Sequence, residues 1–258
     1  MEVCVLASGS KGNSVYIAGG GAAVLVDVGV CAREMSARLQ AAKIDPSTLD
    51  AVLFTHDHVD HYRGADLFSR RYPVRLFANE GTATGIECCF TKRAFQWEIF
   101  ETASGFDIKG LHIEAFTVSH DAADPVGFCF DDGTSRLCLI TDLGQTSPLI
   151  HEKISKCDVA ILESNHDVDM LMASERSWSL KTRIAGRSGH LSNDSAATLM
   201  STAISSKLHT LLLAHLSDEC NTPDLALNTM RRALDKVGRA DVRIEVMSQK
   251  QVSGHYIF

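Results

Sequence analysis

The fold of this chain is decided by the stretch Thr55-His56-Asp57-His58-Val59-Asp60-His61, which directly follows the apolar run 51–54. Imidazole and carboxylate groups are costly to bury without partners. Imidazole nitrogen suits zinc, manganese or iron, and a neighbouring carboxylate suits a metal that keeps a position open for water. The alternative, a polar turn that is rich in histidine, is much the weaker one. The stretch therefore predicts a metal-dependent hydrolase, with four ligands in His56, His58, Asp60 and His61.

Length and composition indicate an ordinary globular protein. At 258 residues the chain can form one large α/β domain or two small ones, and 45% apolar and 22% charged residues are typical values. The start of the chain reads as a strand rather than a secretory signal, and no apolar run is long enough to span a bilayer. The eight cysteines are scattered without a CxxC pair, as reduced thiols are. We expect a cytoplasmic protein without membrane contact.

The net charge of −7 argues against a protein whose whole surface binds nucleic acid. Bound divalent metals would offset several acidic side chains locally, so nucleic acid can still bind at the metal site. Small basic groups, such as Lys181, Arg183 and Arg187, are each better explained as a solvated face than as a docking surface. Composition alone therefore does not decide the substrate.

Short apolar runs recur along the chain, and each of five ends in a residue that can bind a metal or a proton. Runs of four to six apolar residues are typical of strands buried on both faces. In layered α/β folds, ligands gather at strand ends. The pattern predicts one site built from the whole length of the chain, with these strand-end residues: Asp27, His56 (through Thr55), Asp142, Glu163 and His215.

The segments between these runs predict helices and further strands. Helices are expected at 31–43, 60–70, 146–154, 193–206 and 223–238. Residues 105–131 read as consecutive strands, and 241–257 read as a closing pair of strands. Because no repeat or linker interrupts the pattern, we expect a single domain over residues 1–258, with two sheets between helical layers.

The spacing of the ligands indicates two neighbouring metal sites. His56 and His58 are two residues apart, so on an extended segment they point to one side. Asp60 and His61 follow where a helix begins and project in another direction. A water that bridges two such ions loses a proton near neutral pH and becomes the nucleophile. We expect His56, His58 and His120 to hold one ion, and Asp60, His61 and His215 to hold the other, with Asp142 between them.

Several of these residues also suit an ordinary structural role. Taken alone, His120 or His215 would be a common half-buried histidine, and Asp142 would be a turn or cap residue. Together with the stretch 55–61, metal binding becomes the favoured explanation for all three. Asp27 is either an acceptor that orients a ligand histidine or a turn residue at a strand end, and the two alternatives are balanced. The remaining histidines outside these motifs are assigned structural roles: His112, His151, His209 and His255.

The whole set of motifs resembles the metallo-β-lactamase superfamily, whose fold is a four-layer αββα sandwich with two mixed β-sheets. Further segments resemble the YycJ/WalJ family of bacterial metallohydrolases, in the nuclease-like branch. The resemblance implies a 5′-to-3′ exonuclease that acts on double-stranded DNA with two divalent ions, zinc or manganese, and iron as a further option. These segments are ASGSKGNS (7–14), SHDAADPVGF (119–128), TDLG (141–144), ESNHD (163–167), GHLSN (189–193) and AHLSDECNTP (214–223).

The same motifs resemble RNase J, in which an acidic residue of an EST-like motif and a histidine of SGH assist at the phosphate. Glu163 and the segment Ser188-Gly189-His190 occupy comparable places here. Only residues 168–187 separate the two motifs, too few for the β-CASP insertion of those RNases. That departure favours DNA over RNA as the nucleic-acid substrate.

The expected reaction is phosphodiester hydrolysis, in which the metal-bridging hydroxide attacks the phosphate in line. Asp60, Glu163 and His190 are the expected catalytic residues: His190 stabilises the phosphate or protonates the leaving oxygen, and Glu163 orients His190 or a metal ligand. His166 is a candidate to line the same pocket, as is Asp167, which is equally well explained as a helix cap. Ser188 is a further candidate at the phosphate.

The loop 8–13 fits two roles equally well. Its backbone N–H groups, with Ser10, Lys11 and Asn13, could bind phosphate, or its glycines and Asn13 could simply form a hairpin turn. The metal identity, the polarity of attack and the oligomeric state are left open by the sequence.

Two other functions are consistent with the ligands. A metal pair does not choose between carbon and phosphorus, so a small ester, lactone, thioester or β-lactam is an alternative substrate. The motifs around Glu163 and His190 favour a phosphate over a neutral carbonyl. A non-catalytic interaction protein is disfavoured, because every ligand position is filled.

Overall fold

The computed structural model describes residues 1–90 and 94–258, and its strands form two mixed sheets of seven strands. The first sheet has the order β14-β1-β2-β3-β4-β5-β6; its pairs from β14 to β3 are antiparallel and those from β3 to β6 are parallel. Its strands are β1 (Glu2–Ala7), β2 (Ser14–Gly19), β3 (Ala22–Val26), β4 (Ala51–Leu53), β5 (Arg75–Ala78), β6 (Trp97–Ile99) and β14 (Tyr256–Ile257).

The second sheet contains an antiparallel part, β7 to β9, and a parallel part, β10 to β13. These strands are β7 (Gly105–Ile108), β8 (Leu111–Thr117), β9 (Val126–Asp131), β10 (Arg136–Ile140), β11 (Val159–Glu163), β12 (Thr210–Ala214) and β13 (Arg243–Val246). The helices are α1 (Ala32–Ala41), the 3-10 helix η1 (Pro46–Thr48), α2 (Val59–Tyr62), α3 (Ala65–Arg71), α4 (Glu80–Cys88), α5 (Pro148–Ser155), α6 (Val168–Ala173), α7 (Trp178–Ile184), α8 (Asn193–Ala203) and α9 (Pro223–Lys236).

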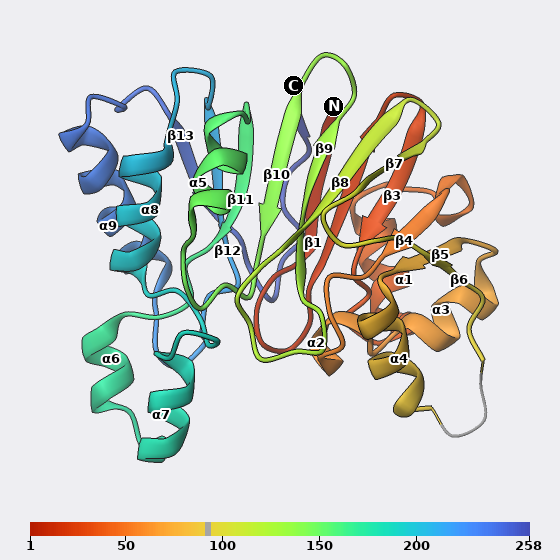
Figure 1. Cartoon of the computed structure of the whole chain (residues 1–258), viewed down its shortest axis with the longest axis horizontal. Helices are drawn as coiled ribbons and strands as arrows, with labels where there is room; N and C mark the ends of the chain where they lie inside the picture. The colour runs from red at the N-terminus through yellow and green to blue at the C-terminus, as the bar shows by residue number, and fades with distance from the viewer. Residues whose placement is uncertain (91–93) are drawn as a thin grey trace. The chain divides into compact units, whose positions relative to one another are not determined.

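The chain divides into two compact units. The first comprises Met1–Thr117, Ala122–Thr134 and Ser248–Phe258. Its sheet has two apolar faces, because side chains alternate along each strand. On one face Phe77 of β5 stacks on Phe106 of β7, with ring centroids 5.2 Å apart. The other face packs against α1, α3 and α4, which contribute Met35, Phe68 and Ile86 to a fully buried core (Figure 1).

The second unit comprises Val118–Asp121 and Ser135–Met247. The parallel strands β10 to β12 are almost wholly buried, and α5, α8 and α9 lie beside them (Figure 1). Ile154 of α5, Met200 of α8 and Leu234 of α9 are buried side chains of these helices. Helix and sheet layers are therefore present as expected, and the predicted αββα fold with two mixed sheets is confirmed.

Three details of the secondary structure differ from expectation. The helix expected at 60–70 is interrupted at Gly64, where a β-carbon would lie 2.3 Å from the carbonyl oxygen of Val30. Helices α4, α6 and α7 were not predicted; α4 carries Gly81 and Gly85, which lower helix propensity. The prediction that residues 241–257 form a closing pair of strands is wrong, because β13 pairs with β12 and β14 pairs with β1.

The part of the chain that the structure describes contains no helix with both the length and the apolar character needed to cross a bilayer.

Candidate metal centre

Three of the predicted site residues lie just beyond strand ends with an uncommon backbone conformation. Asp27, Asp142 and His215 have φ values of 63°, 55° and 56°, in the left-handed region. Aspartate and histidine enter this region more readily than most residues other than glycine, at a cost of about 1 kcal/mol or more each. The bend ends strands β3, β10 and β12 at these points. Residues that both tolerate the bend and bind protons or metals therefore occupy these positions.

In the first unit, one carboxylate fixes two imidazole rings. Asp27 Oδ2 lies 2.7 Å from His61 Nδ1. The hydroxyl of Thr55 donates to the same oxygen at 2.8 Å and lies 3.0 Å from His56 Nδ1, from which it can accept. The N–H of Thr55 donates to Asp27 Oδ1 at 2.9 Å. Asp27 is thus a strand-end turn residue and an acceptor for a histidine at the same time.

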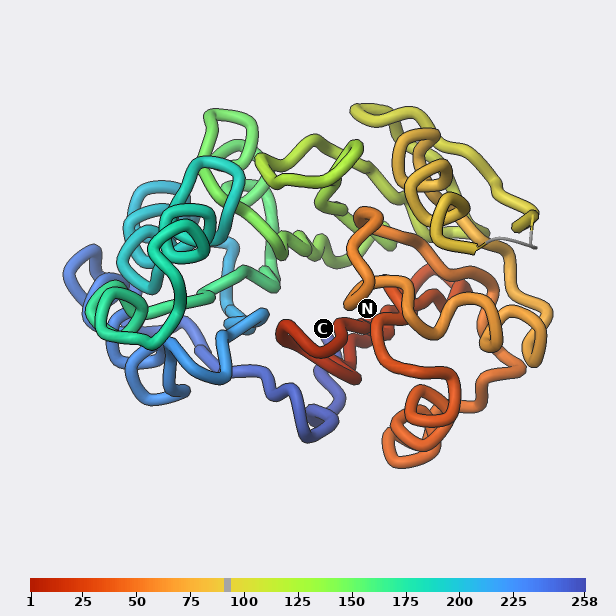
Figure 2. The backbone as a smooth tube through the Cα atoms, turned by 90° about the horizontal axis from the view of Figure 1, so that it is seen from below, coloured from red at the N-terminus to blue at the C-terminus, as the bar shows by residue number. Residues whose placement is uncertain are grey.

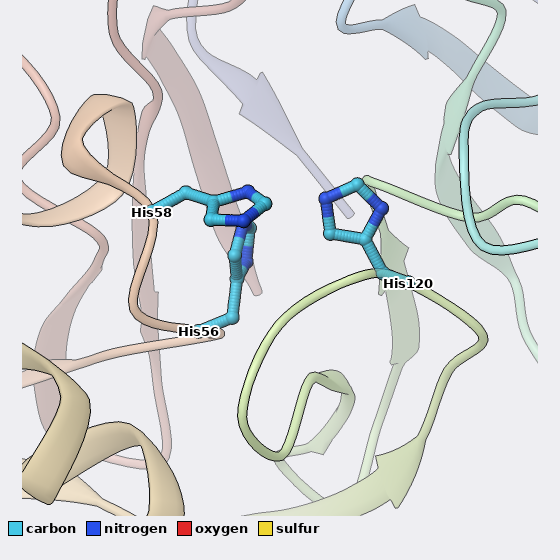
Figure 3. Close-up of side chains that lie close together, drawn as sticks. All are labelled: His56, His58 and His120. Carbon is cyan, nitrogen blue, oxygen red and sulfur yellow. The ribbon is translucent and has the colours of Figure 1, made fainter. Parts of the chain in front are cut away.

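The three histidines of the opening stretch lie close together. The ring centroid of His56 is 4.7 Å from that of His58 and 4.0 Å from that of His61. His56 and His58 come from the loop after β4, and Figure 3 shows their two rings together, as well as His120 from the loop after β8. His56 and His61 are buried, whereas His58 and Asp60 are half-buried at the start of α2.

This arrangement fits a metal. A histidine that binds a metal commonly donates its other ring N–H to a carboxylate, hydroxyl or carbonyl, which fixes the tautomer. The Nδ1 atoms of His56 and His61 make such contacts with Thr55 and Asp27. The Nε2 atoms are then the ones with a lone pair to offer, and with the carboxylate of Asp60 they form a nitrogen and oxygen donor set suited to zinc or manganese.

The second unit has its own cluster around Glu163, the last residue of β11, which is fully buried. Its Oε1 lies 2.7 Å from His190 Nδ1 and 2.8 Å from His215 Nδ1. Its Oε2 accepts the N–H groups of Leu143 and Leu191 at 2.9 and 3.0 Å. One buried carboxylate therefore holds both imidazoles and both of the loops beside them.

Asp142 and His120 complete this cluster. Asp142 Oδ1 lies 3.3 Å from His215 Nδ1 and 3.7 Å from His190 Nδ1. His120 Nδ1 lies 3.0 Å from the carbonyl oxygen of Gly189, and its Nε2 lies 3.8 Å from Asp142 Oδ1. Asp142, Glu163, His190 and His215 offer ligand atoms close enough together to hold a metal ion. His120 shows the same pattern as His56 and His61, with Nδ1 engaged and Nε2 directed elsewhere.

Burial and neighbouring charges move the pKa values of these groups in different directions. Burial would raise the pKa of Glu163, but the imidazoles of His190 and His215 outweigh it and lower the pKa. Burial would lower the pKa of His190, but the Glu163 carboxylate raises it overall. For Asp27 burial dominates and raises the pKa, even though His61 acts in the opposite direction.

The loop 8–13 forms a turn. Asn13 Oδ1 accepts the N–H of Gly9 at 2.8 Å, and the N–H groups of Lys11 and Gly12 also donate within the protein. These contacts form the turn, and Ser10 is exposed on it. The side-chain amide of Asn13 lies 3.0 Å from His61 Nε2, which places Asn13 beside the first cluster.

The remaining candidates occupy different environments. His166 is buried, and its Nδ1 has no hydrogen-bond partner among residues 1–90 and 94–258. Asp167 caps α6 by accepting the N–H of Met170 at 2.9 Å. This is the helix-cap role that the sequence offered beside a role in lining the pocket. Ser188 is exposed in the loop before His190.

Sequence reasoning missed Thr55 and the backbone groups that support the histidines. A hydroxyl directly before His56 was a usable signal, because a ligand histidine needs an acceptor. The carbonyl of Gly189 and the N–H groups of Leu143 and Leu191 leave no trace in side-chain identity, and only the structure reveals them.

Comparison with known proteins agrees with this fold and these clusters. Residues 23–215 match the family model described as a beta-lactamase superfamily domain. The metallo-β-lactamase fold protein YhfI from Bacillus subtilis has a TM-score of 0.74 at 14% identity, covering 98% of each chain. The fold and site thus define a metal-dependent hydrolase of the metallo-β-lactamase superfamily.

Two relatives with assigned names identify the family within this superfamily. Exodeoxyribonuclease YycJ of Bacillus anthracis is 34% identical over 242 residues, which cover 92% of this chain and 90% of that protein. Exodeoxyribonuclease WalJ of Streptococcus pneumoniae serotype 2 (strain D39 / NCTC 7466) is 34% identical over 245 residues, which cover 94% and 90%. The chain belongs to the YycJ/WalJ family.

Proposed function

We propose that this chain is a dinuclear metal-dependent phosphodiesterase that degrades DNA from the 5′ end toward the 3′ end. The DNA substrate is supported by the activity for which the YycJ and WalJ relatives are named. The phosphodiester chemistry rests on one observation, the Glu163 carboxylate that holds both His190 and His215 through Nδ1.

Two divalent ions, zinc or manganese or iron, fit the donors present. We assign His56, His58 and His120 to one ion, Asp60, His61 and His215 to the other, and Asp142 to both. When bound, the ions supply a hydroxide nucleophile near neutral pH and neutralise charge on the phosphate. The Nδ1 contacts of His56 and His120 support this assignment, because they make Nε2 the nitrogen that can offer a lone pair to a metal. Asp27 engages His61 Nδ1 in the same way, and the side-chain amide of Asn13 lies 3.0 Å from its Nε2.

The protein's own contribution is the placing of His190. Its Nδ1 is held by Glu163, and the opposite nitrogen, Nε2, therefore points away from that carboxylate. The side chain of His190 keeps 21% of its surface exposed, while Glu163 is wholly buried. A phosphate can thus reach His190 but not Glu163. In this role His190 stabilises the phosphate or protonates the leaving oxygen, and Glu163 is a positioning residue.

We also propose that residues 1–258 act as a single hydrolase domain without a β-CASP insertion, in the cytoplasm and on DNA rather than RNA. Between the Glu163 and His190 motifs the chain contains only the short helices α6 and α7. A site without that insertion suits the end of a duplex.

The test uses purified protein with Mn²⁺ and a 5′-phosphorylated linear duplex. The parent should degrade it, and Asp142→Ala and His58→Ala should remove activity while keeping the fold. His190→Ala should lower turnover more than it lowers metal content. Unchanged cleavage by His190→Ala would show that its assigned role is wrong. A parallel screen of bis-p-nitrophenyl phosphate, a thioester and nitrocefin separates a phosphodiesterase from a hydrolase of small carbonyl substrates.

A further inference from the structure

Asp57 is the ionisable residue of the stretch 55–61 that is not assigned to a metal ion. It lies in the chain between His56 and His58, whose rings stand together with their centroids 4.7 Å apart (Figure 3). The Asp57 side chain is half-buried, and its carboxyl group contacts other parts of the first unit. Those contacts show what supports the two histidines.

On one side, Asp57 packs against helix α4, which lies beside β5 and β6 (Figures 1 and 2). A β-carbon on Gly85 of this helix would lie 2.2 Å from Asp57 Oδ2 and 2.6 Å from Asp57 Cβ. Real β-carbons essentially never come within 3.0 Å of such an atom. The helix therefore needs glycine at this position to reach Asp57.

On the other side, Asp57 holds the loop that follows His120. Asp57 Oδ1 accepts the N–H of Ala123 at 3.1 Å. Ala123 belongs to the first unit and comes three residues after His120 in the chain. One carboxylate thus connects the backbone between two expected ligands with the segment that leads from a third.

Helix α4 also holds this loop directly. The carbonyl oxygen of Asp124 accepts the side-chain amide of Asn79, the N-cap of α4, at 2.8 Å, and Asn79 is buried. Asp124 Oδ2 accepts the hydroxyl of Thr102 at 3.0 Å. A β-carbon on Gly81 would lie 2.7 Å from Asp124 Cβ. The helix thus contacts Asp124 through both its cap and its first turn.

The two glycines of α4 form one face. Gly81 and Gly85 are four residues apart, so they lie above one another on the helix. Glycine is the poorest helix former after proline, so helix propensity disfavours both positions. The close approach of Asp124 to one and of Asp57 to the other accounts for them.

We propose that α4 positions the ligands of the ion assigned to His56, His58 and His120, here called ion 1, and that Asp57 is the positioning residue through which it acts. Contacts on two sides of the Asp57 side chain fix the backbone between His56 and His58. A ligand that is already oriented loses less freedom when it binds, so its affinity is higher. This inference rests on the proposed assignment of the two ions.

Binding of Mn²⁺ provides the test, because it is measured without DNA. Asp57→Ala should weaken ion 1 about tenfold in a chelator-competition titration, the lower end of the loss found for groups that support metal ligands. The second ion should keep its affinity. Asp57→Asn keeps an oxygen acceptor for the N–H of Ala123 and should bind both ions as the parent does. Unchanged affinity in Asp57→Ala, equal weakening of both ions, or an asparagine variant as weak as the alanine variant would overturn the inference.

Asp158→Ala is the matched control. Asp158 is likewise half-buried, and its Oδ2 accepts a backbone N–H from another segment, that of Arg136, at 2.7 Å. Both alanine variants should unfold at lower urea concentration in EDTA. Only Asp57→Ala should bind ion 1 more weakly, and an equal loss of Mn²⁺ affinity in the control would show that Asp57 acts by general packing and not by positioning.

Gly85→Ala tests the contact from the side of the helix. Alanine is the better helix former, but its β-carbon would displace Asp57, so ion 1 should again be weakened and the second ion retained. Gly254→Ala, where nothing lies within 4 Å of the β-carbon, should leave both affinities unchanged. Parental affinity for ion 1 in Gly85→Ala would overturn the role of α4.

His58→Ala identifies the ion and separates this inference from the proposed function. It should remove ion 1, and Asp57→Ala added to it should leave the remaining ion unchanged; a further loss would overturn the link between Asp57 and ion 1. A parent protein that binds two Mn²⁺ ions and cleaves DNA, with both ions unaltered in Asp57→Ala, overturns this inference alone. The expected binding pattern in a protein that leaves duplex DNA intact overturns the nuclease function alone.

Discussion

Thr55→Val offers the sharpest test of how the metal ligands are held. The substitution keeps the shape of a buried side chain and removes only the hydroxyl. That hydroxyl donates to Asp27 Oδ2 at 2.8 Å and faces His56 Nδ1 at 3.0 Å. Asp27 keeps His61 at 2.7 Å, so the change falls mainly on His56.

Two magnitudes follow from this geometry. Removing the acceptor of a buried N–H costs about 1–3 kcal/mol, so the free energy of unfolding without metal should fall by that amount. Loss of an outer partner of a metal ligand lowers metal affinity about 10- to 100-fold, because the ring of His56 is no longer fixed in tautomer and orientation. One ion should be weakened, and the second should keep its affinity.

Thr210→Val is the matched control. Thr210 is a buried threonine whose hydroxyl lies 2.9 Å from His209 Nδ1, and neither residue is assigned to the metal centre. Both variants should lose stability in urea with EDTA present. Only Thr55→Val should lose affinity for Mn²⁺ in a chelator-competition titration. Equal Mn²⁺ affinity in the two variants would refute the role of Thr55.

Two further predictions concern the loop of His190 and the metal itself. Gly189→Ala should destabilise the protein by about 1–3 kcal/mol, because its β-carbon would lie 2.2 Å from the carbonyl oxygens of Arg183 and Ile184; Gly254→Ala, where nothing lies within 4 Å, should be near neutral in the same urea titration. Zn²⁺ or Mn²⁺ at a hundred times its Kd should add about 2.7 kcal/mol to the free energy of unfolding, and a Tm that does not rise when metal is returned to EDTA-treated protein would contradict a metal site.

The sequence allowed the fold to be predicted where apolar runs are long and uniform. The runs before Asp27, His56, Asp142, Glu163 and His215 are β3, β4, β10, β11 and β12 in the structure. A buried strand needs a continuous apolar stretch, so its signal is strong. The short helices α6 and α7 bury few side chains and have little apolar pattern to detect.

The sequence predicted only those parts of the site that depend on which side chain is present. Histidine and aspartate at strand ends are visible in a sequence, whereas the carbonyl of Gly189 is shared by every residue type. The partner of an edge strand is likewise a matter of three-dimensional arrangement, which explains the error over β13 and β14. Backbone support and strand pairing are therefore set by the three-dimensional arrangement and not by residue type.

The left-handed conformation of Asp27, Asp142 and His215 has a consequence for selection. Glycine would adopt the same bends without steric cost. It would also leave buried groups without the partners that these side chains supply, such as Thr55 and His61 at Asp27 and Glu163 at His215. An orphaned buried group costs about 1–3 kcal/mol, so selection for heat resistance alone should keep the strained residue at these bends.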